Sequence, residues 1–78
     1  MEITVRLFGL DSEKEFSLTL PEDTSLEDLL NKLKNQRTAE EQEMLGNATT
    51  LVNGKEGKGK DPLKDQDKVL ILLPLGGG

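Results

Sequence analysis

The fold is decided by Val69-Leu70-Ile71-Leu72-Leu73-Pro74, a stretch that is apolar on both faces when the chain is extended. Successive side chains of a strand point to opposite sides of a sheet. One face therefore carries Val69, Ile71 and Leu73, and the other carries Leu70 and Leu72. Because a strand that is apolar on both faces is typical of a sheet interior, we predict that this stretch forms a central strand.

Two alternating segments near the start of the chain predict an antiparallel hairpin that ends at Pro21. Residues 2–8 and 15–20 alternate apolar and polar side chains, and a polar turn separates them. The side chains that share an apolar face are Ile3, Val5 and Leu7 in the first segment and Phe16, Leu18 and Leu20 in the second.

After Pro21 the spacing of apolar residues changes from the alternation of a strand to the period of a helix. An amphipathic helix over about residues 25–36 is predicted by leucines at i, i+3, i+4 and i+7, namely Leu26, Leu29, Leu30 and Leu33. Thr24 and Glu27 have the spacing of a capping box for this helix.

A second capping box, Thr38 with Glu41, predicts a short helix that ends at Gly46 and turns Met44 and Leu45 toward the core. Residues 48–53 predict a further short strand, which ends at the turn signal Asn53-Gly54. A loop rich in Gly and Lys follows over residues 55–60. A tight turn over residues 62–65 is expected to tuck Leu63 inward.

The element order strand–strand–helix–strand–strand predicts one mixed sheet wrapped around one helix. If the last strand is central, it pairs in parallel with the first, and residues 9–68 supply the long connection that a parallel pair requires. We therefore predict an α+β chain with the β-grasp fold, in which a four- to five-stranded mixed sheet packs on one main helix. Residues 1–75 form the domain and residues 76–78 form a flexible tail.

Composition excludes several functions. The 78 residues suffice for one small domain and contain no Cys and no His. Thiol nucleophiles, Ser-His or Cys-His pairs and thiolate or imidazole metal sites are therefore absent, and we expect no bound metal or cofactor and no enzyme acting alone. The net charge of −5 argues against nucleic acid or a membrane surface as a partner. The lack of Cys, of a signal pattern and of a long apolar segment leads us to expect a cytoplasmic protein.

Gly76-Gly77-Gly78 is the strongest candidate for chemistry. Glycine has no Cβ, so such a tail can lie extended in a narrow channel and present its carboxylate without steric hindrance. A carboxylate is a poor electrophile until it is activated, typically by adenylation. The alternative interpretation is a frayed terminus or residues left from cloning.

The face of the last strand that points away from the helix is a candidate partner-binding surface. Leu70 and Leu72, joined by Phe8, would form an exposed apolar patch beside the tail. Pro74 and Leu75 lead from this patch into the tail, and we include them among the predicted partner-binding residues.

A possible phosphate-binding loop is rejected. Residues 54–60 match G-x-x-x-x-G-K, but Asp61 stands where Ser or Thr would hold Mg²⁺, and Pro62 follows in place of a helix. A flexible polar loop is the simpler interpretation.

The chain resembles the MoaD/ThiS family of ubiquitin-like sulfur carriers over nearly its whole length. The segments that carry the resemblance are Phe8-Gly9, Pro21-Glu22-Asp23-Thr24 leading into Leu29-Leu30, Val52-Asn53-Gly54, Leu63-Lys64-Asp65-Gln66-Asp67-Lys68-Val69, Leu72-Leu73-Pro74 and Gly77-Gly78. The family usually has Gly-Asp before the last strand, where this chain has Gln66-Asp67, and often has Pro-Pro where this chain has Leu73-Pro74. Gly76 lengthens the tail.

The resemblance implies that an adenylating enzyme related to ubiquitin activators uses ATP to convert the carboxylate of Gly78 to an acyl-adenylate. Sulfur donation then gives a thiocarboxylate. In MoaD-like members, which this chain resembles more in length, the sulfur passes to the molybdopterin precursor within a complex with a larger synthase subunit. A ThiS-like carrier for the thiazole of thiamin, a protein modifier that forms isopeptide bonds to lysines, and an inert binding module remain the alternatives.

Overall fold

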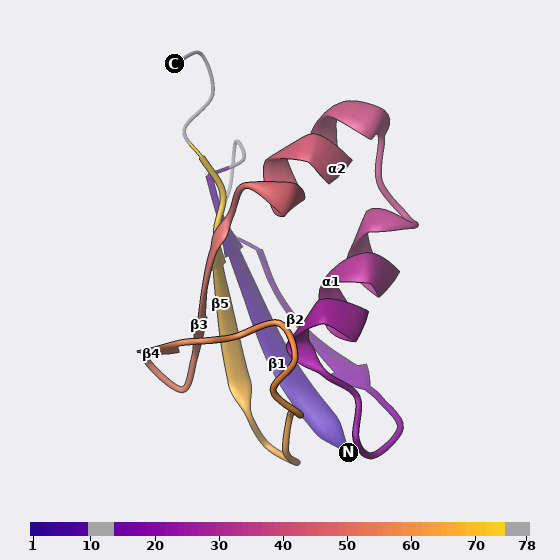
Figure 1. Cartoon of the computed structure of the whole chain (residues 1–78), viewed down its shortest axis with the longest axis vertical. Coiled ribbons are helices and arrows are strands. Elements are labelled where there is room, and N and C mark those ends of the chain that lie inside the picture. The colour runs from indigo at the N-terminus through magenta and orange to yellow at the C-terminus, as the bar shows by residue number, and fades with distance from the viewer. Residues whose placement is uncertain (10–13, 75–78) are drawn as a thin grey trace.

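The computed structural model describes residues 1–9 and 14–74, which form a mixed sheet covered on one side by two helices (Figure 1). The strands are β1 (Glu2–Phe8), β2 (Lys14–Thr19), β3 (Thr49–Val52), β4 (Lys55–Glu56) and β5 (Lys68–Leu72). The helices are α1 (Leu26–Lys34) and α2 (Ala39–Gly46). Within this part of the chain, no helix is long and apolar enough to cross a membrane.

The sheet order, β2-β1-β5-β3-β4, confirms that the last strand is central. β5 pairs in parallel with β1, where Val5 lies beside Val69, and antiparallel with β3, where Thr50 lies beside Ile71. β1 and β2 form the predicted antiparallel hairpin. The parallel pairing of the first and last strands is the β-grasp arrangement that the sequence predicts.

The core lies between the inner face of the sheet and the helices. It is built without an aromatic residue among its fully buried members, in keeping with a composition of two Phe and no Trp or Tyr. The buried residues are Ile3, Val5, Leu7, Leu20, Leu26, Leu29, Leu33, Leu45, Leu63, Val69, Ile71 and Leu73. Leu63 is therefore tucked inward as predicted, and Met44 packs against the core from α2.

The first helix begins one residue later than predicted. Its capping box is formed by Ser25 and Asp28, not by Thr24 and Glu27. The cause is tertiary: the carbonyl of Thr24 accepts the N–H of Leu63 at 2.8 Å, and Ser25 forms a β-bridge with Pro62. This pairing holds the chain extended through Ser25, so the serine becomes the N-cap.

Leu30 also departs from the prediction. Of the four leucines in the helical stripe, only Leu26, Leu29 and Leu33 are buried, whereas Leu30 is half-buried at the edge of the core. The second helix agrees with its sequence signal, because the Thr38 Oγ accepts the N–H of Glu41 at 3.2 Å and the Glu41 carboxylate reaches back to Thr38.

Two turns use backbone conformations that few residues adopt. Asn53 and Gly54, at φ 53° and 84°, join β3 to β4, a two-residue strand within the predicted loop. Such consecutive positive φ values suit tight hairpins. Gln66 has φ 71°, in the left-handed region that favours glycine. The turn before β5 therefore has a glycine-like conformation although the usual Gly is replaced by Gln.

Candidate functional site

The helices leave the outer face of the sheet uncovered (Figure 1). This face carries a continuous apolar strip. In the parallel ladder, Phe8 lies beside Leu72 and Arg6 lies beside Leu70. Leu72 is 38% exposed, and Phe8 and Leu70 are half-buried. The structure thus brings together the three residues that the sequence assigned to one patch, and their role in binding stays a prediction.

Leu51 extends this strip onto β3 and was missing from the sequence-based patch. It pairs with Leu70 in the antiparallel ladder and is half-buried. The signal was present in the sequence, since Thr50 and Val52 face the core and the residue between them must face outward. We call Phe8, Leu51, Leu70 and Leu72 the outer strip.

Arg6 borders the outer strip with a positive charge. Its guanidinium carbon lies 5.1 Å from the centre of the Phe8 ring, within the range of a cation–π contact. Its Nε lies 3.7 Å from Glu15 Oε2, and both side chains are well exposed, so this ion pair contributes little to stability. Arg6 therefore lies over the Phe8 ring and gives the strip a charged border.

The chain leaves the sheet at Leu73, which we call the tail root. The Leu73 N–H donates to the carbonyl of Phe8 at 2.9 Å, and Leu73 is only 7% exposed. The next residue, Pro74, is exposed. The predicted residues Leu75, Gly76, Gly77 and Gly78 lie outside the described residues, as does the predicted boundary at residue 75, and their roles stay predictions.

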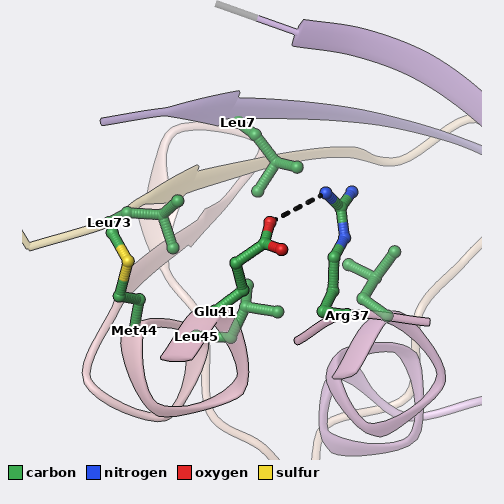
Figure 2. Close-up of a pocket in the computed structure, with 7 residues that line it drawn as sticks. Leu7, Arg37, Glu41, Met44, Leu45 and Leu73 are labelled. Atoms are coloured by element: carbon green, nitrogen blue, oxygen red, sulfur yellow. Dashed lines mark hydrogen bonds and ion pairs between the residues drawn. The ribbon is translucent and has the colours of Figure 1, made fainter. Parts of the chain in front are cut away.

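The Leu73 side chain forms one wall of a small apolar pocket between the sheet and α2 (Figure 2). The other apolar walls are Leu7, Leu33, Met44 and Leu45. The space left among them is about 10 Å³, so it holds no substrate-sized molecule. The pocket therefore anchors the tail root and is no candidate for ligand binding.

An ion pair closes this pocket at its rim. Arg37 Nη1 lies 3.4 Å from Glu41 Oε2, as the dashed line in Figure 2 shows. Hydrogen bonds from the Thr38 side chain and backbone, and then the charge of Arg37, lower the pKa of Glu41. Glu41 is therefore ionised at neutral pH, which makes it a poor general acid and a weak general base.

The sequence matches the model of the ThiS family over residues 5–78. The chain belongs to the ThiS family. This membership confirms the resemblance to the MoaD/ThiS carriers on which the sequence interpretation rests. A search of curated protein sequences found no match.

Solved structures agree with this family in fold. The chain is 28% identical to a chain in the complex of subunits 1 and 2 of molybdopterin-converting factor from Helicobacter pylori, with a TM-score of 0.70 and all of both chains covered. It shares its fold with SAMP1 from Haloferax volcanii at 19% identity and a TM-score of 0.76, over 100% of both chains. Urm1 from Trypanosoma brucei is similar at 24% identity and a TM-score of 0.70, over 99% of this chain and 95% of that one.

Proposed function

We propose that this ThiS-family chain is a sulfur carrier that works with partner enzymes and has no catalytic activity of its own. The Gly78 carboxylate attacks the α-phosphorus of ATP on an adenylating partner, which gives an acyl-adenylate and releases pyrophosphate. A hydrosulfide ion then attacks the acyl carbon through its sulfur. The bond to AMP breaks, AMP leaves, and a thiocarboxylate remains.

The observation that carries this proposal is the position of the tail root beside the outer strip. Leu72 is exposed on the outer face, and the next residue, Leu73, is fixed in the core. Gly78 is five residues beyond Leu73, so it lies within about 18 Å of the tail root even if the chain is fully extended. A partner that covers the outer strip can therefore receive Gly78 in an active site close to the same surface.

The proposal for the recipient of the sulfur is supported by the relative from Helicobacter pylori, which is 28% identical to this chain. That relative is subunit 1 in a complex with subunit 2 of molybdopterin-converting factor. We propose by analogy that the thiocarboxylate serves molybdopterin-type cofactor synthesis and that a larger synthase subunit binds the outer strip. The thiocarboxylate sulfur is anionic at neutral pH and is the nucleophile in the second transfer.

The test uses the complete chain, a variant that lacks Gly78, and the cognate adenylating enzyme. We expect ATP–pyrophosphate exchange with the complete chain and none with the variant, because the variant presents its carboxylate one residue short. Folding stability, measured by urea denaturation, should be nearly equal for the two chains, because a terminal glycine has no side chain to bury.

Intact mass spectrometry of the product then identifies the chemistry. Replacement of one oxygen by sulfur supports the carrier. Conjugates to lysine side chains without any thiocarboxylate would overturn it in favour of a protein modifier. Exchange that persists without Gly78 would refute the proposed role of the tail altogether.

A further inference from the structure

Gly9 lies against the tail root at a distance that only glycine allows. A Cβ built on Gly9 would lie 2.9 Å from the Leu73 Cβ and 2.9 Å from the Leu73 carbonyl oxygen. Two carbon atoms in contact prefer a separation of about 3.5–4.0 Å, and a Cβ essentially never lies within 3.0 Å of any non-bonded heavy atom, so either contact forces atoms to move. Rotation of the Leu73 side chain cannot relieve the overlap, because a Cβ and a backbone oxygen are fixed by the backbone itself.

Leu73 has little freedom to retreat from such an overlap. Its N–H is hydrogen-bonded to Phe8, the residue directly before Gly9. Its side chain is buried in the pocket of Figure 2, with Leu7 and Leu45 among the walls. A side chain at position 9 would therefore displace the backbone at residues 73 and 74, where the tail begins.

We propose that Gly9 is a positioning residue for activation of the tail: its missing side chain sets where the chain leaves the sheet and in which direction. This inference rests on the function proposed above. A docked partner would hold the domain at Leu72 and the terminal residue in its active site, with the tail root between them. Because the partner fixes the domain, movement of the whole domain does not compensate for a displaced root. The extended tail then presents Gly78 at a shifted position relative to ATP.

Gly9 also has a φ of +111°, so an alanine at this position would strain the backbone. The test must therefore separate this backbone strain from displacement of the tail root. Gly54 provides the matched control. It has φ +84°, so an alanine there is also strained, but a Cβ on Gly54 meets no atom within 4 Å. Gly54 lies in the turn beside the start of β5, where the neighbouring Asn53 N–H donates to Lys68, whereas Gly9 lies at the other end of that strand.

The experiment measures ATP–pyrophosphate exchange with Gly9→Ala, Gly54→Ala and the unchanged chain, each titrated against the adenylating enzyme. Misplacement of a reacting group by about 1 Å can cost up to about 100-fold in rate. We expect Gly9→Ala to lower kcat about 10- to 100-fold with KM changed less than about twofold, since the outer strip still docks. Gly54→Ala should leave both kcat and KM close to those of the unchanged chain.

A second variant keeps the inference testable if Gly9→Ala does not fold. Leu73→Ala removes the side chain that anchors the root without adding any atom beside Gly9, and it should also lower kcat more than it raises KM. Normal kcat in a folded Gly9→Ala protein, or normal kcat in Leu73→Ala, would overturn the inference. Such a result would refute only the positioning role of Gly9 and would not affect the proposed carrier function. ATP–pyrophosphate exchange that does not require Gly78 would refute the carrier function itself.

Discussion

The neighbouring leucines Leu29 and Leu30 allow a matched test of where the core ends. Both lie in α1, and alanine at either position makes the same chemical change within the same helix. Leu29 is 0% exposed, whereas Leu30 is half-buried and lies on the rim of the core. The difference in unfolding free energy between the two alanine variants therefore reports burial alone, because the change in helix propensity is common to both.

The magnitude follows from the burial of each side chain. Replacement of a fully buried leucine by alanine costs about 2–5 kcal/mol, and Leu29→Ala belongs to this class. For a chain of 78 residues, a typical stability is roughly 4–12 kcal/mol, so this one change removes a large share of the total. Leu30→Ala removes a side chain that water already reaches and leaves no closed cavity, and we expect a loss of about 1 kcal/mol.

Urea denaturation of both variants, followed by circular dichroism, measures these losses. The urea concentration at the unfolding midpoint should fall much further for Leu29→Ala than for Leu30→Ala. The slope of the unfolding free energy against urea concentration should stay unchanged in both variants, as expected when only stability changes. If Leu29→Ala is too unstable to fold, Leu29→Met should be folded and cost less than about 1.5 kcal/mol, because the side-chain volume is kept. A loss for Leu30→Ala equal to or larger than that for Leu29→Ala would refute this description of the core.

Two further predictions concern the outer strip and the turn before β5. Leu72→Asp should leave the fold intact, because Leu72 is already 38% exposed, and should weaken binding to the adenylating enzyme at least about tenfold, because binding would bury an unpaired charge. Calorimetric titration measures this affinity. The control is Asn31→Asp, which adds the same charge at an exposed position of α1, on the helix side of the sheet. Unchanged affinity of Leu72→Asp would remove the outer strip from the interface. Gln66→Gly should raise the unfolding free energy by about 0.5–1 kcal/mol, because Gln66 has a φ of 71°, which strains any residue other than glycine. Urea denaturation measures this change. A lower unfolding free energy would show that the Gln66 side chain contributes more to stability than the backbone strain costs.

The sheet could be predicted because its decisive signals are local. The two apolar faces between Val69 and Leu73 require a central strand, and a central strand at the end of the chain requires a parallel partner far away in sequence. The Thr38–Glu41 capping box was likewise predictable, because both partners lie within four residues of each other and need no other part of the chain.

The errors arose where distant segments meet. The start of α1 at Leu26, with Ser25 as its N-cap, depends on pairing of residues 24–26 with residues 61–63. Nothing near Thr24 in the sequence reveals this pairing. The apolar stripe of α1 includes Leu30, but the width of the core beneath the helix decides how much of a stripe is buried. Leu51 was a different kind of omission, because the alternation along β3 already placed it outward.

Gly9 shows most clearly what a sequence leaves hidden. Its neighbour Phe8 was assigned to the outer face from alternation, but the need for glycine at position 9 arises from Leu73, which is 64 residues away. The parallel pairing of β1 with β5 brings the end of both strands to the same edge of the sheet, so the residue after β1 meets the residue after β5. Only the register of this pairing reveals the contact.

The alternation along β5 separates two roles that meet at the tail root. Val69 and Ile71 face the core and set stability, whereas Leu70 and Leu72 face outward and are available to a partner. Substitutions at Val69 or Ile71 should therefore change folding stability but not partner binding. Substitutions at Leu70 or Leu72 should change partner binding but not folding stability. Leu73 belongs to the core but directly precedes the tail, so it couples the two roles. Under the proposed function, a rigid root reduces the conformational freedom that the remaining five residues lose when a partner binds the tail. This is the physical reason for holding Leu73 between the Gly9 contact on one side and the apolar pocket on the other.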